Sequence, residues 1–257
     1  MIPISDDNPT LRPPIVTYVM LGLIWAAWLL LQGAGFDQVA LASSICKLGL
    51  VAGELTGLAP VGEEVLLGPG LRCLVDNAPI NLFTPVTSMF LHGGWAHILG
   101  NSLFLWVFGN NVEDSMGRGR FVVFYLVCGL AAAAAQVLVS PASPVPMVGA
   151  SGAISGVMGA YLILYPRVRV NMLFIIFIII RIIPVPAWAV LLWWFGLQVL
   201  TGLPELTQVD SDVSGGVAVW AHVGGFVAGV VLIKLFENPR LKSRREAWRH
   251  RLHSNHP

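Results

Sequence analysis

The chain has 257 residues, of which 56% are hydrophobic and only 11% are charged, and its mean hydropathy is +0.74. Soluble domains carry roughly one quarter charged residues, so this composition excludes an ordinary soluble globular protein and indicates a membrane protein. The net charge of +1, with basic residues gathered at the ends of apolar segments, argues against a nucleic-acid partner. The three cysteines have no CxxC spacing, so a thiolate metal site is not expected.

Six apolar segments are predicted to span the bilayer, which requires about 20 mostly apolar residues for each helix. The fifth segment is long and interrupted by Pro184 and Pro186, so we count it as one span with an irregular beginning. No basic region precedes the first segment, so we expect a retained anchor rather than a signal peptide. The predicted fold is an all-α membrane protein, a six-transmembrane-helix bundle. The six segments are 15–32, 95–112, 121–139, 151–165, 172–200 and 216–236.

The positions of Lys and Arg predict the orientation of this bundle, because the cytoplasmic flanks of membrane spans are enriched in these residues. With the N-terminus inside, most basic residues fall on the cytoplasmic side. This predicts a cytoplasmic N-terminus at 1–14, the six-span domain at 15–236 and a basic cytoplasmic tail at 237–257. The long first external loop, 33–91, is equally compatible with short helices on the membrane surface and with a plain connector.

Two of the cysteines, Cys46 and Cys73, fall in the external loop, whereas Cys128 lies in the third span. An oxidising compartment allows disulfides to form and persist. We therefore expect that Cys46 and Cys73 can form a disulfide.

Polar residues within membrane spans are costly, so each one is a candidate for function. Ser151 and His222 both lie 14 residues before the cytoplasmic ends of their spans, hence about 21 Å above those ends. Asn101 and His97 come to roughly 18 and 24 Å in the second span. All four residues are therefore expected in one layer toward the external side. The three groups of such polar residues lie at 92–101, 149–153 and 221–229.

A serine and a histidine at one depth suggest nucleophilic catalysis. The hydroxyl of Ser151 is a weak nucleophile until a base takes its proton, and His222 is the only histidine in the later spans. Asn101 and His97 share a helix face, and together with the Ser151 amide they could donate to an oxyanion. Small residues on both spans would let the two helices approach closely. These are Gly152, Gly156 and Gly159 on one span and Gly225 and Gly229 on the other.

Each of these features has a simpler explanation when taken alone. An intramembrane serine or asparagine often only joins helices, glycine spacing often serves packing, and three histidines could bind Zn²⁺. However, HExxH is absent, and no carboxylate accompanies these groups at ligand spacing, so neither a metal nor a cofactor is expected. The combination of all these residues at one depth favours serine chemistry.

The stretches at 92–114, 149–153 and 221–229 resemble the signature motifs of the rhomboid family, HxxxxHxxxN, GxSG and AHxxG, in the family's order. The resemblance extends from about residue 15 to residue 236. It implies an intramembrane serine endopeptidase that hydrolyses peptide bonds in or near transmembrane helices of membrane-protein substrates, without a cofactor. A compact six-span chain also suits a multi-pass protein of the bacterial inner membrane.

The same resemblance assigns roles to individual residues. It implies a catalytic dyad rather than a triad, formed by Ser151 and His222. His97, Asn101 and Gly149 match the positions that line the oxyanion site, and His92 matches a more structural histidine at its mouth.

Two positions depart from the family pattern. Ser155 stands where many members carry an aromatic residue that stacks on the catalytic histidine, so we expect Trp220 or Phe226 to support the imidazole instead. The tryptophan-arginine pair that is common in the first external loop is also missing before His92. Neither departure removes a catalytic group.

Two other functions suit such a chain. A catalytically silent rhomboid-like protein that binds transmembrane clients would be expected to lack Ser151 or His222, but both are present. A transporter would also place polar groups at one depth, but no intramembrane carboxylate or internal repeat supports it. Asp210 and Asp212 lie too far before His222 along the chain to orient it, so the dyad is expected to act without a carboxylate.

Overall fold

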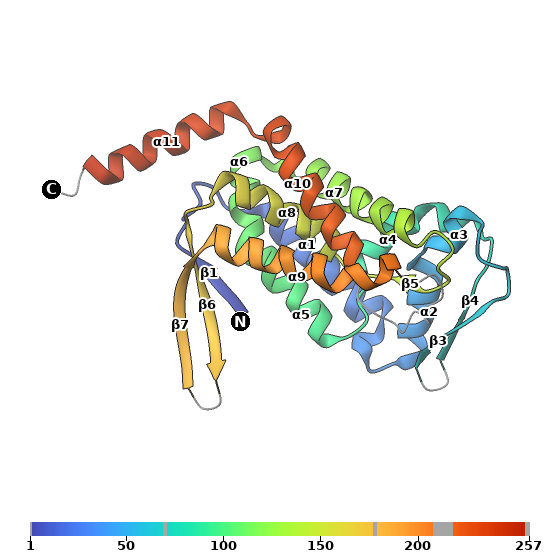
Figure 1. The fold of residues 1–257 in the computed structure, drawn as a ribbon. Coiled ribbons are helices and arrows are strands. Elements are labelled where there is room, and N and C mark those ends of the chain that lie inside the picture. The colour runs from blue at the N-terminus through green and yellow to red at the C-terminus, as the bar shows by residue number, and fades with distance from the viewer. Residues whose placement is uncertain (1, 69–70, 177–178, 208–217, 255–257) are drawn as a thin grey trace.

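The computed structural model describes residues 2–68, 71–176, 179–207 and 218–254, which form a bundle of helices with one three-stranded sheet at one end and two two-stranded sheets at the other (Figure 1). In this part of the chain, three helices are long and apolar enough to cross a membrane. They are α7 (Arg118–Val139), α9 (Ala187–Thr207) and α10 (Val219–Phe236). Gly216, the predicted start of the last span, lies outside the described residues.

The other predicted spans are helical but shorter or segmented, so the count of six stays a prediction. The first is α1 (Ile15–Ala26), which continues into a π-helical turn, η1 (Ala27–Leu31). The fourth is α8 (Ser151–Leu164). The second consists of three consecutive segments, namely α5 (Trp95–Phe104), the π-helical η5 (Leu105–Gly109) and α6 (Asn110–Met116).

The predicted fifth span, 172–200, is wrong in its first half, which is a β-hairpin. The run of Ile, Val and Phe favours strands over helix. Pro184 and Pro186 lie in an edge strand, where prolines are tolerated, whereas both would disrupt a helix interior. Helix α9 therefore begins only at Ala187, and the fold is not all-α. The antiparallel sheet has the order β1-β6-β7, with strands β1 (Ile2–Asp6), β6 (Arg169–Ile176) and β7 (Ile179–Pro186).

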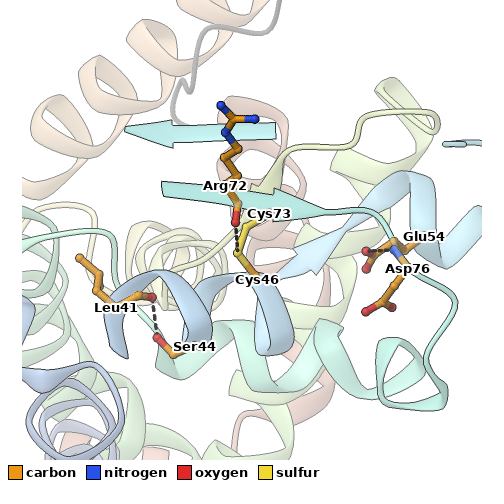
Figure 2. Close-up of a disulfide and its surroundings, with 7 residues drawn as sticks. All are labelled: Leu41, Ser44, Cys46, Glu54, Arg72, Cys73 and Asp76. Atoms are coloured by element: carbon orange, nitrogen blue, oxygen red, sulfur yellow. Dashed lines mark hydrogen bonds between the residues drawn. A yellow bond between two sulfur atoms is a disulfide. The ribbon is translucent and has the colours of Figure 1, made fainter. Parts of the chain in front are cut away.

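The predicted external loop, 33–91, is folded rather than a plain connector, and we refer to its end of the bundle as the loop end. A disulfide between Cys46 and Cys73, with Cα atoms 5.2 Å apart, joins α2 to β4 and confirms the predicted pairing (Figure 2). The helical elements are η2 (Gly33–Gly35), α2 (Gln38–Leu48), α3 (Ala52–Thr56), η3 (Pro79–Phe83), α4 (Thr84–Thr87) and η4 (Ser88–Phe90). The hairpin consists of β3 (Glu64–Gly68) and β4 (Leu71–Leu74).

The loop end also braces the segment that leads into α8. Strand β2 (Leu50–Val51) pairs with β5 (Pro146–Met147), and only three residues separate β5 from the start of α8. The amide of Gly53 donates a 2.9 Å hydrogen bond to the carbonyl of Ser143. The chain therefore enters α8 from a fixed direction.

Helices α8 and α10 pack with their backbones in contact, which confirms the predicted close approach. A Cβ atom added to Gly225 would overlap the carbonyl oxygen of Gly152, and one added to Gly229 would overlap that of Gly156. Only a residue without a side chain fits at these two positions of α10, as in other small-residue helix interfaces in membranes.

We refer to the opposite end of the bundle as the tail end. There, buried polar side chains connect segments that are far apart in the sequence. Glu113 accepts hydrogen bonds from two backbone amides at the start of α1, and Asp114 accepts one from Arg12 Nε at 3.0 Å. From α11 (Pro239–Ser254), the buried guanidinium of Arg245 reaches to 3.9 Å from Asp114. These contacts tie the start of α1 and the first half of α11 to α6.

Gly229→Ala is expected to lower the thermal unfolding midpoint of the protein in detergent, because the added methyl group must push α10 away from Gly156. Overpacking of this kind costs about 1–3 kcal/mol. The matched control is Gly22→Ala in α1, where nothing lies within 4 Å of an added Cβ, so the midpoint should be unchanged or higher. Equal midpoints for the two variants would contradict the backbone contact.

Candidate active site

Ser151 and His222 meet where α8 packs against α10. Ser151 is the first residue of α8, and its Oγ lies 2.8 Å from Nε2 of His222, which is in the first turn of α10. His222 is buried, with 8% of its surface exposed. A hydrogen bond of this length is within the range that a general base needs to take a proton from the hydroxyl.

The other nitrogen of the imidazole is held by a residue that the sequence analysis missed, Gln198 of α9. Its Oε1 lies 2.7 Å from His222 Nδ1. An amide oxygen can only accept a hydrogen bond, so Nδ1 must carry the proton, and Nε2 is left as the acceptor for Ser151. The signal in the sequence was a single glutamine within an apolar span, which is costly unless it has a partner.

The aromatic support of His222 also comes from α9, which corrects the expectation of Trp220 or Phe226. The ring of Trp194 lies 5.7 Å from that of His222, centroid to centroid, at an interplanar angle of 41°. Trp220 instead donates a hydrogen bond to a carbonyl of α9, and the ring of Phe226 packs against Trp194, with centroids 6.1 Å apart. Ser155 is buried and donates to the carbonyl of Ser151 at 2.6 Å.

His97 and Gly149 lie beside Ser151. A Cβ added to Gly149 would lie 2.6 Å from His97 Nε2 and 3.4 Å from Ser151 Oγ, so both atoms face the space above this glycine. Gly149 has φ = +133°, which strongly favours glycine, and its amide donates to the carbonyl of Ser88 at 2.9 Å. The Nδ1 atom of His97 accepts from Gly93, so Nε2 is the nitrogen that can donate.

Asn101, one turn further along α5, is also buried. Its Nδ2 has no hydrogen-bond partner among the described residues. Buried polar groups without a partner are rare in folded proteins, so an unused donor at such a position calls for an explanation.

His92 is fixed through its backbone at the N-terminal side of α5. Gln32 accepts a hydrogen bond from the amide of His92 at 2.9 Å and donates one to its carbonyl at 2.7 Å. The two rings of His92 and His97 meet edge to face at 5.0 Å. Burial, with the neighbouring His97, lowers the pKa of His92 to about 3, so this ring is neutral at physiological pH.

Acidic residues and metal ligands are not part of this arrangement as far as the structure describes it. Asp210 and Asp212 lie outside the described residues. Within the described ranges, no three His, Cys, Asp or Glu side chains gather in a way that could hold a metal ion. The expectation of a site without metal or cofactor stays a prediction.

Comparison with known proteins shows which family the sequence belongs to. The sequence matches the family model of the Rhomboid domain over residues 80–238, more than half of the chain. The chain belongs to the rhomboid family. Together with its long apolar helices, this membership makes the protein an integral membrane protein.

This rhomboid is 28% identical over 258 aligned residues to RHOMBOID-like protein 5 of Arabidopsis thaliana, an alignment that covers 90% of the chain and 72% of that protein. It is 44% identical over 81 residues to rhomboid protease GluP of Bacillus subtilis, covering 32% of the chain and 15% of that protein. The mitochondrial RHOMBOID-like protein 12 of Arabidopsis thaliana is 28% identical over 223 residues, covering 80% and 60%. The chain thus spans less than two thirds of the length of the last two relatives.

Proposed function

We propose that this rhomboid is an intramembrane serine endopeptidase, with Ser151 as the nucleophile and His222 as its base. The observation that carries the proposal is the 2.8 Å contact between Ser151 Oγ and His222 Nε2 in a buried site. The similarity to a relative named a rhomboid protease, GluP, supports the same activity. The substrates are membrane proteins cleaved in or near their transmembrane helices.

The reaction follows from the different partners of the two imidazole nitrogens. His222 Nε2 takes the proton of Ser151 as Oγ attacks the scissile carbonyl, and the same proton then passes to the leaving amine. Water hydrolyses the acyl-enzyme with His222 again as base. Throughout, Nδ1 keeps its own proton.

The negative charge on the attacked carbonyl oxygen needs donors that are already in place. We assign this role to His97 Nε2, Asn101 Nδ2 and the amide of Ser151 at the positive end of the α8 dipole. The unpartnered Nδ2 of Asn101 supports the assignment. Because its amide already donates to Ser88, Gly149 serves by leaving room for the oxyanion beside His97. His92 supports the ring of His97.

We further propose the six-span topology of a bacterial inner-membrane rhomboid, with a domain at 15–236 and with 1–14 and 237–257 in the cytoplasm. The long external loop would then lie outside, and the site would open toward that side. Substrate helices would approach beside α9, the least buried of the three long helices of the described chain.

A catalytically silent rhomboid that binds transmembrane clients is the alternative. It would have no need of a serine hydroxyl bonded to a buried, oriented imidazole. The contact between Ser151 and His222 therefore favours the enzyme.

Ser151→Ala and His222→Ala are each expected to abolish cleavage of a labelled single-span substrate by the purified protein in liposomes, because one removes the nucleophile and the other its base. The matched control is Ser115→Ala in α6, where the buried hydroxyl bonds only to a carbonyl of its own helix, and this variant should cleave normally. Cleavage that persists in Ser151→Ala would refute the serine mechanism.

Asn101→Ala should lower turnover roughly 10²-fold, as loss of one oxyanion donor typically does, with little effect on folding. Its neighbour Ser102, which accepts a hydrogen bond from Trp25 instead, provides the control variant Ser102→Ala. Turnover in the double variant Asn101→Ala, His97→Ala equal to that of the unmodified protein would remove both residues from the oxyanion site.

Reporter fusions test the orientation. A reporter after Arg251 should be active as a cytoplasmic protein, and one inserted near Gly62 should be active only outside, because the basic residues flank the cytoplasmic ends of the predicted spans. A cytoplasmic Gly62 reporter would reverse the proposed topology.

A further inference from the structure

We propose that Gln198 is a positioning residue of the active site, so that the working unit is Gln198, His222 and Ser151 rather than an isolated pair. The inference rests on the proposed serine protease function. It gives α9, which carries neither of the catalytic residues, a direct role in the chemistry.

The two hydrogen bonds on His222 define this role. Gln198 Oε1 lies 2.7 Å from Nδ1, and Ser151 Oγ lies 2.8 Å from Nε2, so both ring nitrogens have one partner each. Because the amide oxygen can only accept, the proton of the neutral ring is confined to Nδ1. The lone pair of Nε2 is then always directed at the nucleophile.

Gln198 also acts when the ring becomes charged. Once His222 has taken the serine proton, both nitrogens carry hydrogen, and the bond from Nδ1–H to Oε1 becomes charge-assisted and stronger. Within the described residues, no carboxylate bonds to this ring, and its titratable neighbour is His97. A neutral amide thus takes the place that a carboxylate has in a Ser-His-Asp triad.

Trp194 is a second side chain of α9 that contacts His222. It lies one helical turn before Gln198, on the same face of α9, and its ring lies against that of His222. Gln198 holds an edge of the imidazole and Trp194 holds its face, so two side chains of one helix orient the ring. This explains how the site functions with Ser155 where the family often has an aromatic residue.

The test compares two substitutions of similar size, with kcat and KM measured for the full-length protein in detergent. Gln198→Leu keeps the shape but loses the acceptor, so kcat should fall roughly 10- to 10²-fold with KM within about twofold. This loss is at most the lower end of the roughly 10²- to 10⁴-fold that base catalysis contributes, because His222 itself remains. Gln198→Glu keeps the acceptor and should retain most of the turnover. Thr201→Val, whose hydroxyl bonds only to carbonyls of its own helix, should behave as the unmodified protein.

A purely structural role for Gln198 would give a different pattern. An unchanged kcat in Gln198→Leu, a rise in KM alone, or an equal loss in Gln198→Leu and Gln198→Glu would overturn the proposal. Failure of the serine mechanism is separable, because it would appear as cleavage by Ser151→Ala, whatever Gln198 does.

A spectroscopic measurement covers the case in which Gln198→Leu folds poorly. In ¹⁵N-histidine-labelled protein carrying Ser151→Ala, the ring of His222 should be protonated at Nδ1. Adding Gln198→Glu should keep that tautomer, and adding Gln198→Met should mix it with the Nε2–H form. A mixture already present with Gln198 in place would overturn the proposal.

Discussion

The backbone contact between α8 and α10 is the constraint on which the rest of the site depends. Gly225 and Gly229 let the carbonyls of Gly152 and Gly156 approach to a distance at which no side chain fits. At this separation, a serine on one helix and a histidine on the other can share a hydrogen bond. A bilayer offers no hydrophobic drive to bring helices together, so close packing of small surfaces has to supply the attraction.

The rest of the site depends on the loop end, where a short strand pairing and hydrogen bonds hold the backbone in place. Three contacts hold the segments beside Ser151. They are the pairing of β2 with β5, the hydrogen bond from Gly149 to Ser88 and the two hydrogen bonds between Gln32 and the backbone of His92. Oxyanion donors are useful only if they need no rearrangement during the reaction. The folded segment at 33–91, with its disulfide, provides that rigidity beside the helix bundle.

Much of this site could be predicted from the sequence, because the rise of a helix is constant. Counting 14 residues from the ends of two spans placed Ser151 and His222 in one layer, and the structure brings them into contact. Glycines at helical spacing gave the close approach. The position of Cys46 and Cys73 in one external segment gave the disulfide.

The contribution of α9 could not be found in the same way, because the depth of a residue depends on where its helix begins. Treating 172–186 as part of the span put the beginning in the wrong place. With the start at Ala187, Gln198 is 11 residues and about 16 Å along the helix, close to the layer of His222. Which face of α9 meets the imidazole depends on packing, which a single sequence does not record.

The central claim is that helix packing produces one activated serine, and labelling of intact membranes with a fluorophosphonate tests it most directly. We predict a single adduct, located by peptide mass spectrometry on Ser151 and lost in His222→Ala protein that is still folded. An unlabelled protein, an adduct on another serine, or labelling at the same rate without His222 would contradict the account.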